Sequence, residues 1–206
     1  GIVTALDDVS FAIPQGKTLG LCGESGSGKS VSTKAMMQLL PKNAIIDPKT
    51  EILFRKRDGS VIDIAKLSPR SNEIREVRGG EIGMIFQEPM TSLNPVFTCG
   101  DQVLEAIMLH QKLKKDAAKK LTIKLFKKVQ LPDPERIYNT YPHQISGGQK
   151  QRVMIAMAMS CEPSVLIADE PTTALDVTVQ KTILLLMQEL QREQDMGILF
   201  ITHDLG

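Results

Sequence analysis

The segment Gly23-Glu24-Ser25-Gly26-Ser27-Gly28-Lys29-Ser30 constrains the fold most, because it matches the phosphate-loop pattern G-x-x-x-x-G-K-[ST]. Glycines suit such a loop because a Cβ would block the approach of backbone N–H groups to phosphate oxygens. The pattern has meaning only between a strand and a helix. Lys17–Cys22 predicts a short buried strand, and Ser30–Leu40 predicts a helix that stops at Pro41. The chain is therefore predicted to contain an α/β nucleotide-binding core.

The loop also predicts the contacts to a nucleotide. Lys29 is expected to reach the β- and γ-phosphates, and the Ser30 hydroxyl is expected to bind Mg²⁺. The helix that begins near Lys29 would add the positive end of its dipole. The full predicted set for this loop is Gly23, Ser25, Gly26, Ser27, Gly28, Lys29, Ser30 and Val31.

Composition excludes several other classes of protein. The 206 residues suit one domain, and 25 Lys and Arg against 24 Asp and Glu leave a net charge of +1. That balance, with 4% aromatic residues and no Trp, does not fit a nucleic-acid-binding surface. The longest apolar run, Val153–Met159, is far shorter than the ~20 residues of a membrane helix. No signal peptide is expected, and the three scattered cysteines predict neither zinc nor a disulfide framework.

The first half of the chain alternates strand patterns with turns. Ala5–Ile13 is predicted to be a strand, with Phe11 in the core. Glu51–Arg55 and Val61–Ile64 flank a turn at 58–60 and predict a hairpin. Glu81–Phe86 is a further apolar strand.

The second half begins with helices and returns to strands. Apolar residues recur at helical spacing from about 100 to 159, with eight lysines between 112 and 128 on the other face. We interpret these lysines as a solvated helix face, with contact to acidic lipid headgroups as the alternative. Val165–Ala168 and Gly197–Thr202 are predicted strands, separated by an amphipathic helix over Val177–Gln194.

Polar residues follow three of these strands. Asp169 and Glu170 end a fully apolar strand, where a carboxylate faces the ligand crevice of an α/β sheet. Asp169 is the predicted acidic partner of Mg²⁺, and Glu170 the general base that activates water. Gln87 could contact Mg²⁺ or that water, although a Gln that ends a strand is often only structural. His203 could donate to the γ-phosphate or the water, whereas His110 and His143 are interpreted as structural or surface residues.

A second glycine-containing helix start is predicted at Ser146-Gly147-Gly148-Gln149. Its backbone N–H groups would form another anion site, which one chain does not obviously need. We infer that this site serves the nucleotide of a partner chain; a plain glycine turn that caps a helix is the alternative.

Taken in order, Gly23–Ser30, Gln87, Ile145–Gln149, Val165–Glu170 and Ile201–Asp204 make the chain resemble ABC transporter nucleotide-binding domains over essentially its whole length. Phe86–Pro95, Tyr141-Pro142-His143 and Ala168–Thr178 are similar to the dipeptide, oligopeptide, glutathione and nickel importers. The first cassette of glutathione-type importers is the nearest likeness.

The resemblance implies an α/β fold with a RecA-like P-loop NTPase core (1–92 and 160–206), a small antiparallel β subdomain and an inserted helical subdomain (93–159). It implies ATP and Mg²⁺, a head-to-tail dimer with a second cassette, and Asp176 as a bridge between the two sites. It further implies two membrane permease subunits, a solute-binding protein, no nucleic acid, and a peripheral position on the cytoplasmic face of the inner membrane.

Several departures accompany the resemblance. The segment Ile145–Gln149, which corresponds to the family's signature motif, begins with Ile145 in place of the usual Leu. Residues 1–4 contain no Tyr or Phe that could stack on adenine. The chain is predicted to be truncated at both ends. ABC ATPases of DNA repair and translation factors remain the alternative class, although neither long coiled coils nor a charged linker is present.

Overall fold

The computed structural model describes residues 3–24, 26–86, 92–173 and 175–203. A four-stranded parallel sheet lies at its centre, in the order β1-β6-β5-β4. Its strands are β1 (Thr18–Cys22), β4 (Ile82–Ile85), β5 (Val165–Asp169) and β6 (Gly197–Thr202). A separate antiparallel pair is formed by β2 (Leu53–Arg55) and β3 (Val61–Asp63), with Phe54 opposite Ile62. The predicted α/β class, with a parallel sheet and a small antiparallel one, is confirmed.

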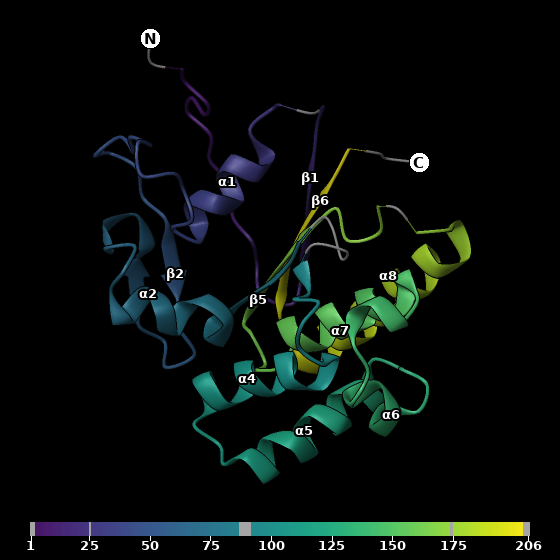
Figure 1. Cartoon of the computed structure of the whole chain (residues 1–206). Coiled ribbons are helices and arrows are strands. Elements are labelled where there is room, and N and C mark those ends of the chain that lie inside the picture. The colour runs from purple at the N-terminus through teal and green to yellow at the C-terminus, as the bar shows by residue number, and fades with distance from the viewer. Residues whose placement is uncertain (1–2, 25, 87–91, 174, 204–206) are drawn as a thin grey trace.

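Helices surround the sheet and extend beyond it (Figure 1). Figure 1 shows β2 and α2 on one side and α4 to α7 gathered below the sheet. The helices are α1 (Lys29–Met36), α2 (Asn72–Glu76), α4 (Cys99–Gln111), α5 (Lys115–Lys128), α6 (Pro134–Tyr138), α7 (Gly147–Ala158) and α8 (Val177–Gln194). Shorter helical turns are η1 (Ile64–Lys66), η2 (Val77–Glu81, kinked at Gly79) and η3 (Pro142–Gln144).

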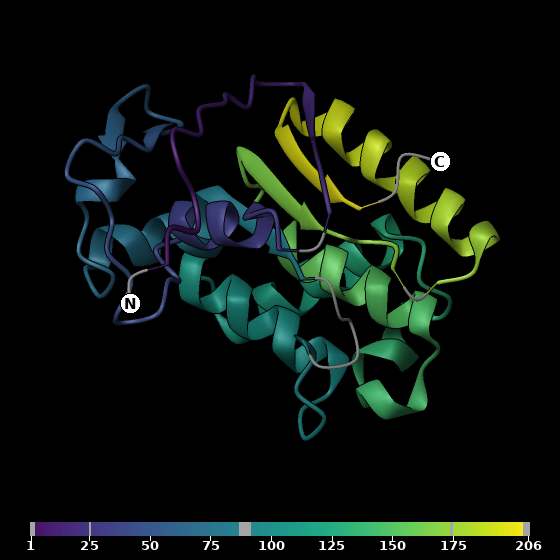
Figure 2. The same cartoon turned by 90° about the horizontal axis from the view of Figure 1, so that it is seen from above.

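The apolar strands are buried on both faces because alternate side chains enter two different cores. From β5 and β6, Leu166 and Ile198 join a large core built with α4, α5, α7 and α8. Their neighbours Ile167 and Leu199 join a smaller core with Met37, Phe54 and Ile74. As a result α1 and α8 lie on opposite faces of the sheet, as seen from above in Figure 2.

Four expectations for the first forty residues are wrong. Residues 5–13 contain no strand, because no neighbouring strand pairs with them and Asp8 has a φ of 48° that interrupts an extended chain. Phe11 is exposed instead of lying in the core. The first helix ends at Met36, not Leu40, since Gln38 adopts a φ of 50°. In addition, β1 is only half-buried because it is an edge strand of the described sheet.

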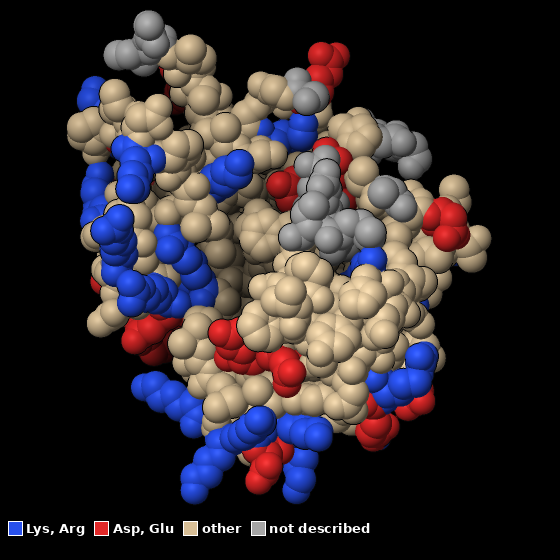
Figure 3. All heavy atoms as spheres, viewed as in Figure 1, with Lys and Arg blue, Asp and Glu red and all other residues tan. Residues whose placement is uncertain are grey.

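Seven of the eight lysines between 112 and 128 are exposed and Lys128 is half-buried. Blue side chains gather at the bottom of Figure 3, where α5 lies in Figure 1. No helix in the described ranges is both long and apolar enough to cross a bilayer.

Candidate functional site

The strand order brings the predicted catalytic elements to one edge of the sheet. Because all four strands are parallel, their carboxyl ends meet at that edge, where α/β sheets bind ligands. The phosphate loop follows β1, His203 follows β6, and Asp169 ends β5, and these three strands are direct neighbours. Gln87 and Ser25 lie outside the described residues.

The phosphate loop ends in a helix start that no side chain of the described residues caps. Gly28 is the N-cap of α1 with a φ of 90°, and Gly26 has a φ of 84°. Such left-handed conformations favour glycine. The first turn of α1 has no side-chain cap and no acidic residue, so its N–H groups and positive dipole end are available to an anion.

Lys29 lies against this loop with 9% of its surface exposed. Its ammonium group donates to the carbonyl oxygens of Gly23 and Glu24, the latter at 2.7 Å, and lies 3.4 Å from Ser27 Oγ. These contacts hold a positive charge at the mouth of the loop. Ser30, the next residue of α1, is exposed and Val31 is half-buried.

The N-terminal segment packs on the loop, a contact that sequence reasoning missed. A Cβ on Gly28 would lie 2.6 Å from Leu6 Cδ2 and 2.9 Å from the carbonyl oxygen of Ala5. Only a glycine fits at this position, for steric as well as conformational reasons. The apolar residues within 5–13 were the available signal, but they were interpreted as a strand.

Asp169 is buried, with 9% of its surface exposed. Burial, followed by repulsion from Glu170, raises the pKa of Asp169, while Lys29 and Lys34 act in the opposite direction. The carboxylate is therefore costly to hold without a cation.

The oxygen donors here suit Mg²⁺. The described residues contain no cluster of three or more His, Cys, Asp or Glu that could form an all-protein cage. Magnesium ordinarily binds through one or two protein oxygens together with water and substrate phosphates. Asp169 and the Ser30 hydroxyl could supply those protein oxygens, so the residues fit Mg²⁺ that arrives with a nucleotide.

Glu170 and His203 are brought into contact by the β5–β6 pairing. Oε1 of Glu170 lies 3.1 Å from Nδ1 of His203, and Oε2 accepts from the Thr173 hydroxyl at 3.1 Å. The Glu170 side chain is 13% exposed against 55% for His203. Glu170 also has a φ of 46°, an uncommon conformation for a residue with a Cβ. Thr173 was not among the predicted site residues, although it follows the Asp-Glu pair closely.

The Ser146–Gln149 motif begins α7 with a reciprocal cap. Ser146 Oγ accepts from the Gln149 N–H at 3.3 Å, and Gln149 Oε1 accepts from the Ser146 N–H at 3.0 Å. Gly147 and Gly148 are the first helical residues, so their backbone is free of bulky side chains at an exposed helix start. The segment therefore caps its own helix, which is the plain structural role. Anion binding stays possible, because the cap uses the N–H groups of Ser146 and Gln149 and not those of Gly147 and Gly148.

The start of α8 packs beside this motif. A Cβ on Gly147 would meet Leu175 at 3.6 Å, and one on Gly148 would meet Val179 at 3.0 Å. Asp176 is the N-cap of α8 and accepts from the Val179 N–H at 3.0 Å. Asp176 therefore has a clear structural role within the chain.

The remaining histidines lie away from this edge. His110 is half-buried beside Gly79 and Gly80, and burial lowers its pKa. His143 stacks on Tyr141 with ring centroids 5.7 Å apart. Both positions agree with the structural interpretation.

Comparison with known proteins identifies this arrangement. The family model described as "ABC transporter" matches residues 6–173. The chain belongs to the ABC transporter family. This cassette is 51% identical over 202 residues to the glutathione import ATP-binding protein GsiA of Pectobacterium atrosepticum, which covers 98% of the chain and 32% of that relative. Its identity to GsiA of Escherichia coli K12 is 49% over 204 residues, or 99% of the chain and 32% of the relative.

The chain thus spans about one third of the length of these curated relatives. Among solved structures, the cassette MJ0796, described as a dimer in a post-hydrolysis state bound to ADP and Pi, matches with a TM-score of 0.76 and 29% identity. That match covers 98% of this chain and 81% of the other. CbiO1 of Clostridium perfringens matches with a TM-score of 0.74 and 28% identity, over 97% and 72% of the two chains.

Proposed function

We propose that this cassette binds and hydrolyses ATP to power import of a peptide-type solute, in the manner of a glutathione importer. The observation that carries the chemistry is the contact between Glu170 and His203 at the strand ends beside the phosphate loop. His203 and Thr173 orient the Glu170 carboxylate. A carboxylate held in this way, next to the backbone N–H groups of the phosphate loop, can activate water for attack on a bound phosphate.

Each residue then has a distinct task. Lys29 and the N–H groups of Gly26 to Val31 bind the β- and γ-phosphates, with Ser25 and Ser27 completing the loop. Ser30 and Asp169 would hold Mg²⁺, with Gln87 as a further oxygen donor, and the ion would supply positive charge to neutralise the phosphates. Glu170 accepts the proton of the water that attacks the γ-phosphate, ADP is the leaving group, and His203 orients Glu170 and the γ-phosphate.

The second nucleotide-binding surface would act on a partner. In a head-to-tail dimer the start of α7, formed by Ser146, Gly147, Gly148 and Gln149, would contact the ATP of the opposing cassette. The N–H groups of Gly147 and Gly148, which the reciprocal cap between Ser146 and Gln149 does not use, would face its phosphate. The dimer described for MJ0796 supports this arrangement. Asp176, at the start of α8 that packs beside Gly147 and Gly148, would lie between the two sites.

The transport role rests on the relatives. Both GsiA proteins are named as glutathione import ATP-binding proteins, which supports an import role. We also propose that the cassette acts on the cytoplasmic face of the inner membrane with two permease subunits and a solute-binding protein. We further propose that 93–159 moves as a helical subdomain against a core formed by 1–92 and 160–206. A DNA-repair or translation ABC ATPase is the alternative, and no nucleic acid is expected as a ligand.

Two experiments test the proposal. Mg²⁺-dependent ATP hydrolysis by the full-length protein should disappear in Lys29→Ala, and absence of hydrolysis in the parent would contradict the ATPase assignment. Purification from native membranes, with co-purifying chains identified by mass, should recover two polytopic subunits. Recovery of ribosomes or DNA-repair factors would leave the ATPase chemistry in place and refute import.

A further inference from the structure

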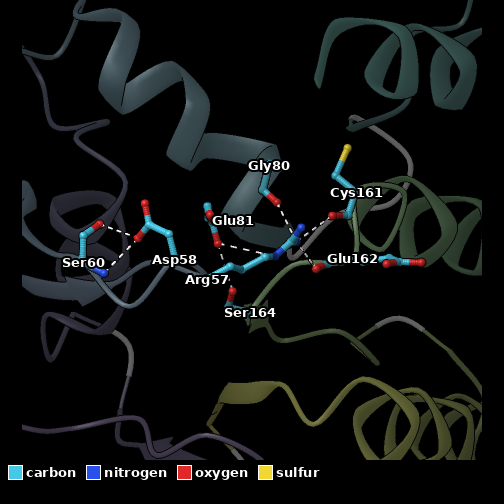
Figure 4. Close-up of polar contacts among 8 residues, drawn as sticks. All are labelled: Arg57, Asp58, Ser60, Gly80, Glu81, Cys161, Glu162 and Ser164. Carbon is cyan, nitrogen blue, oxygen red and sulfur yellow. Dashed lines mark hydrogen bonds and ion pairs between the residues drawn. The ribbon is translucent and has the colours of Figure 1, made fainter. Parts of the chain in front are cut away.

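Arg57 connects three segments that are distant in sequence (Figure 4). Its Nη2 atom donates to the carbonyl oxygens of Gly80, at 3.2 Å, and Cys161, at 2.7 Å, and it also contacts that of Glu162. Its Nε atom lies 3.6 Å from Glu81 Oε2. One guanidinium from the β2–β3 turn thus contacts both η2 and the chain that leaves α7.

The turn that presents Arg57 is itself well ordered by hydrogen bonds. Asp58 Oδ1 accepts from the backbone N–H of Ser60 at 2.8 Å and from its hydroxyl at 2.6 Å. These bonds lower the pKa of Asp58 because they favour its charged form. Gly59, with a φ of 85°, closes the turn. Arg57 therefore projects from a defined turn and not from a loose loop.

Arg57 provides a positive charge near the C-terminal end of α7, where the helix itself has none. A helix leaves unsatisfied carbonyl groups and a partial negative charge at its C-terminus, which basic side chains in the last turn often neutralise. The last turn of α7 contains no basic residue. The carbonyl groups of Cys161 and Glu162 just beyond it accept instead from Arg57, and that of Ser160 accepts from Gln111 of α4 at 2.6 Å.

The C-terminal end of α7 also packs closely against β4 and is linked to Glu81 through Ser164. A Cβ on Gly83 of β4 would lie 2.5 Å from the carbonyl oxygen of Ala158, the last residue of α7. Glu81 Oε2, which pairs with Arg57, also accepts from the Ser164 hydroxyl at 3.0 Å. Since backbone bonds join Ser164 to Glu81 and Gly197, this contact links the end of α7 to the sheet.

The opposite end of α7 carries Ser146–Gln149. The helix has 12 residues and is therefore about 18 Å long, so a tilt of about 10° at one end moves the other by about 3 Å. A displacement of that size would break hydrogen bonds from the signature to a phosphate. We propose that Arg57 is a positioning residue that fixes the signature helix on the core and so sets the geometry in which it meets the partner's ATP. This inference rests on the proposed function for its effect on turnover.

The test uses the full-length protein with Arg57→Ala, Arg57→Lys and, as a matched control, Arg55→Ala on the exposed face of β2. Amide hydrogen exchange is measured for 147–164 and for α1. Arg57→Ala should raise exchange in 159–164 by about tenfold or more and leave α1 unchanged. Arg57→Lys should be intermediate, because an ammonium cannot serve the carbonyls and Glu81 in the same fork geometry. Arg55→Ala should match the parent.

Steady-state ATP hydrolysis distinguishes a positioning role of Arg57 from a general loss of folded protein. Arg57→Ala should lower kcat about tenfold with KM for ATP changed less than about twofold, since its own phosphate loop is untouched. Exchange and kcat both within about twofold of the parent would overturn the inference, as would a rise in KM with kcat retained. If the parent hydrolyses no ATP, the proposed function fails, and hydrogen exchange still decides whether Arg57 fixes α7.

Glu81→Gln covers the case in which Arg57→Ala fails to fold. It removes the charge that pairs with Arg57 and keeps an acceptor for Ser164. A smaller change in exchange and kcat in the same direction supports the inference, and parent values in both measurements would overturn it.

Discussion

Nδ1 of His203 lies 3.1 Å from Oε1 of Glu170, a contact between residues that follow β6 and β5. Thr173 occupies the other carboxylate oxygen from the adjacent loop. The carboxylate is thereby held from two sides at the edge of the sheet where the phosphate loop also lies.

Glu170→Gln should stop turnover and preserve ATP binding. The amide keeps the shape of the side chain and loses its basicity, so kcat should fall by about 10²–10⁴-fold. Binding is measured with a fluorescent nucleotide and turnover by phosphate release. Glu135→Gln on the exposed surface of α6 is the control. Hydrolysis by Glu170→Gln at the parent rate would mean that another base acts.

Lys29→Ala should abolish tight ATP binding. The ammonium is held over the loop by the Gly23 and Glu24 carbonyls, and a charge-assisted contact to phosphate is worth about 1.5–3 kcal/mol or more. Calorimetry with ATP should give a Kd at least about tenfold higher. Lys17→Ala, just before β1, should bind as the parent does. Tight binding by Lys29→Ala would refute the phosphate-loop assignment.

Gly28→Ala and Gly26→Ala should differ in stability. Both glycines have a positive φ, so each alanine should cost about 1–2 kcal/mol in backbone strain. Gly28→Ala should cost more, because its Cβ also meets Leu6 and the Ala5 carbonyl, whereas a Cβ on Gly26 meets no atom of the described residues within 4 Å. Urea unfolding measures both. Equal losses would show that the N-terminal segment does not pack on the loop in solution.

Asp169→Asn should stabilise the nucleotide-free protein at neutral pH while it weakens Mg²⁺-dependent hydrolysis. Burial raises the pKa of Asp169, so the charged form is less favourable in the folded than in the unfolded chain. The charged carboxylate destabilises the folded protein fully at a pH above its raised pKa in the folded state. This destabilisation disappears at a pH below the ordinary pKa of 3.8. The gain in melting temperature should therefore shrink as pH falls through this range. A gain that grows towards acid pH would contradict the raised pKa.

Ser146→Arg should block association of two cassettes and leave ATP binding by each one intact. The larger side chain covers the helix start that would face the partner's phosphate. Light scattering with ATP, in the Glu170→Gln background, measures association. Ser146→Ala is the comparison variant, because it removes the capping oxygen, at a cost of about 1 kcal/mol, without covering the helix start. Loss of binding within each cassette would contradict a role in trans.

Local sequence predicted most elements of this fold. The runs Val165–Ala168 and Gly197–Ile201 contain no polar side chain, as expected for strands buried on both faces, and the structure places both in the sheet. The hairpin around Gly59 and the helix Val177–Gln194 were equally clear from turn chemistry and period. The prediction of a strand over 5–13 was wrong because a strand exists only with a neighbour to pair with, and sequence pattern does not supply one.

The sequence by itself determined which chemical groups this protein has. Glycine, lysine and carboxylate at fixed spacings define a phosphate loop and an acidic strand end, because that chemistry depends on residues close together in the chain. Only the tertiary structure decided which distant groups meet. Strand order joined His203 to Glu170, packing seated Leu6 against Gly28, and the hairpin turn carried Arg57 to the end of α7. These contacts depend on pairing and packing over long separations, which no local pattern encodes.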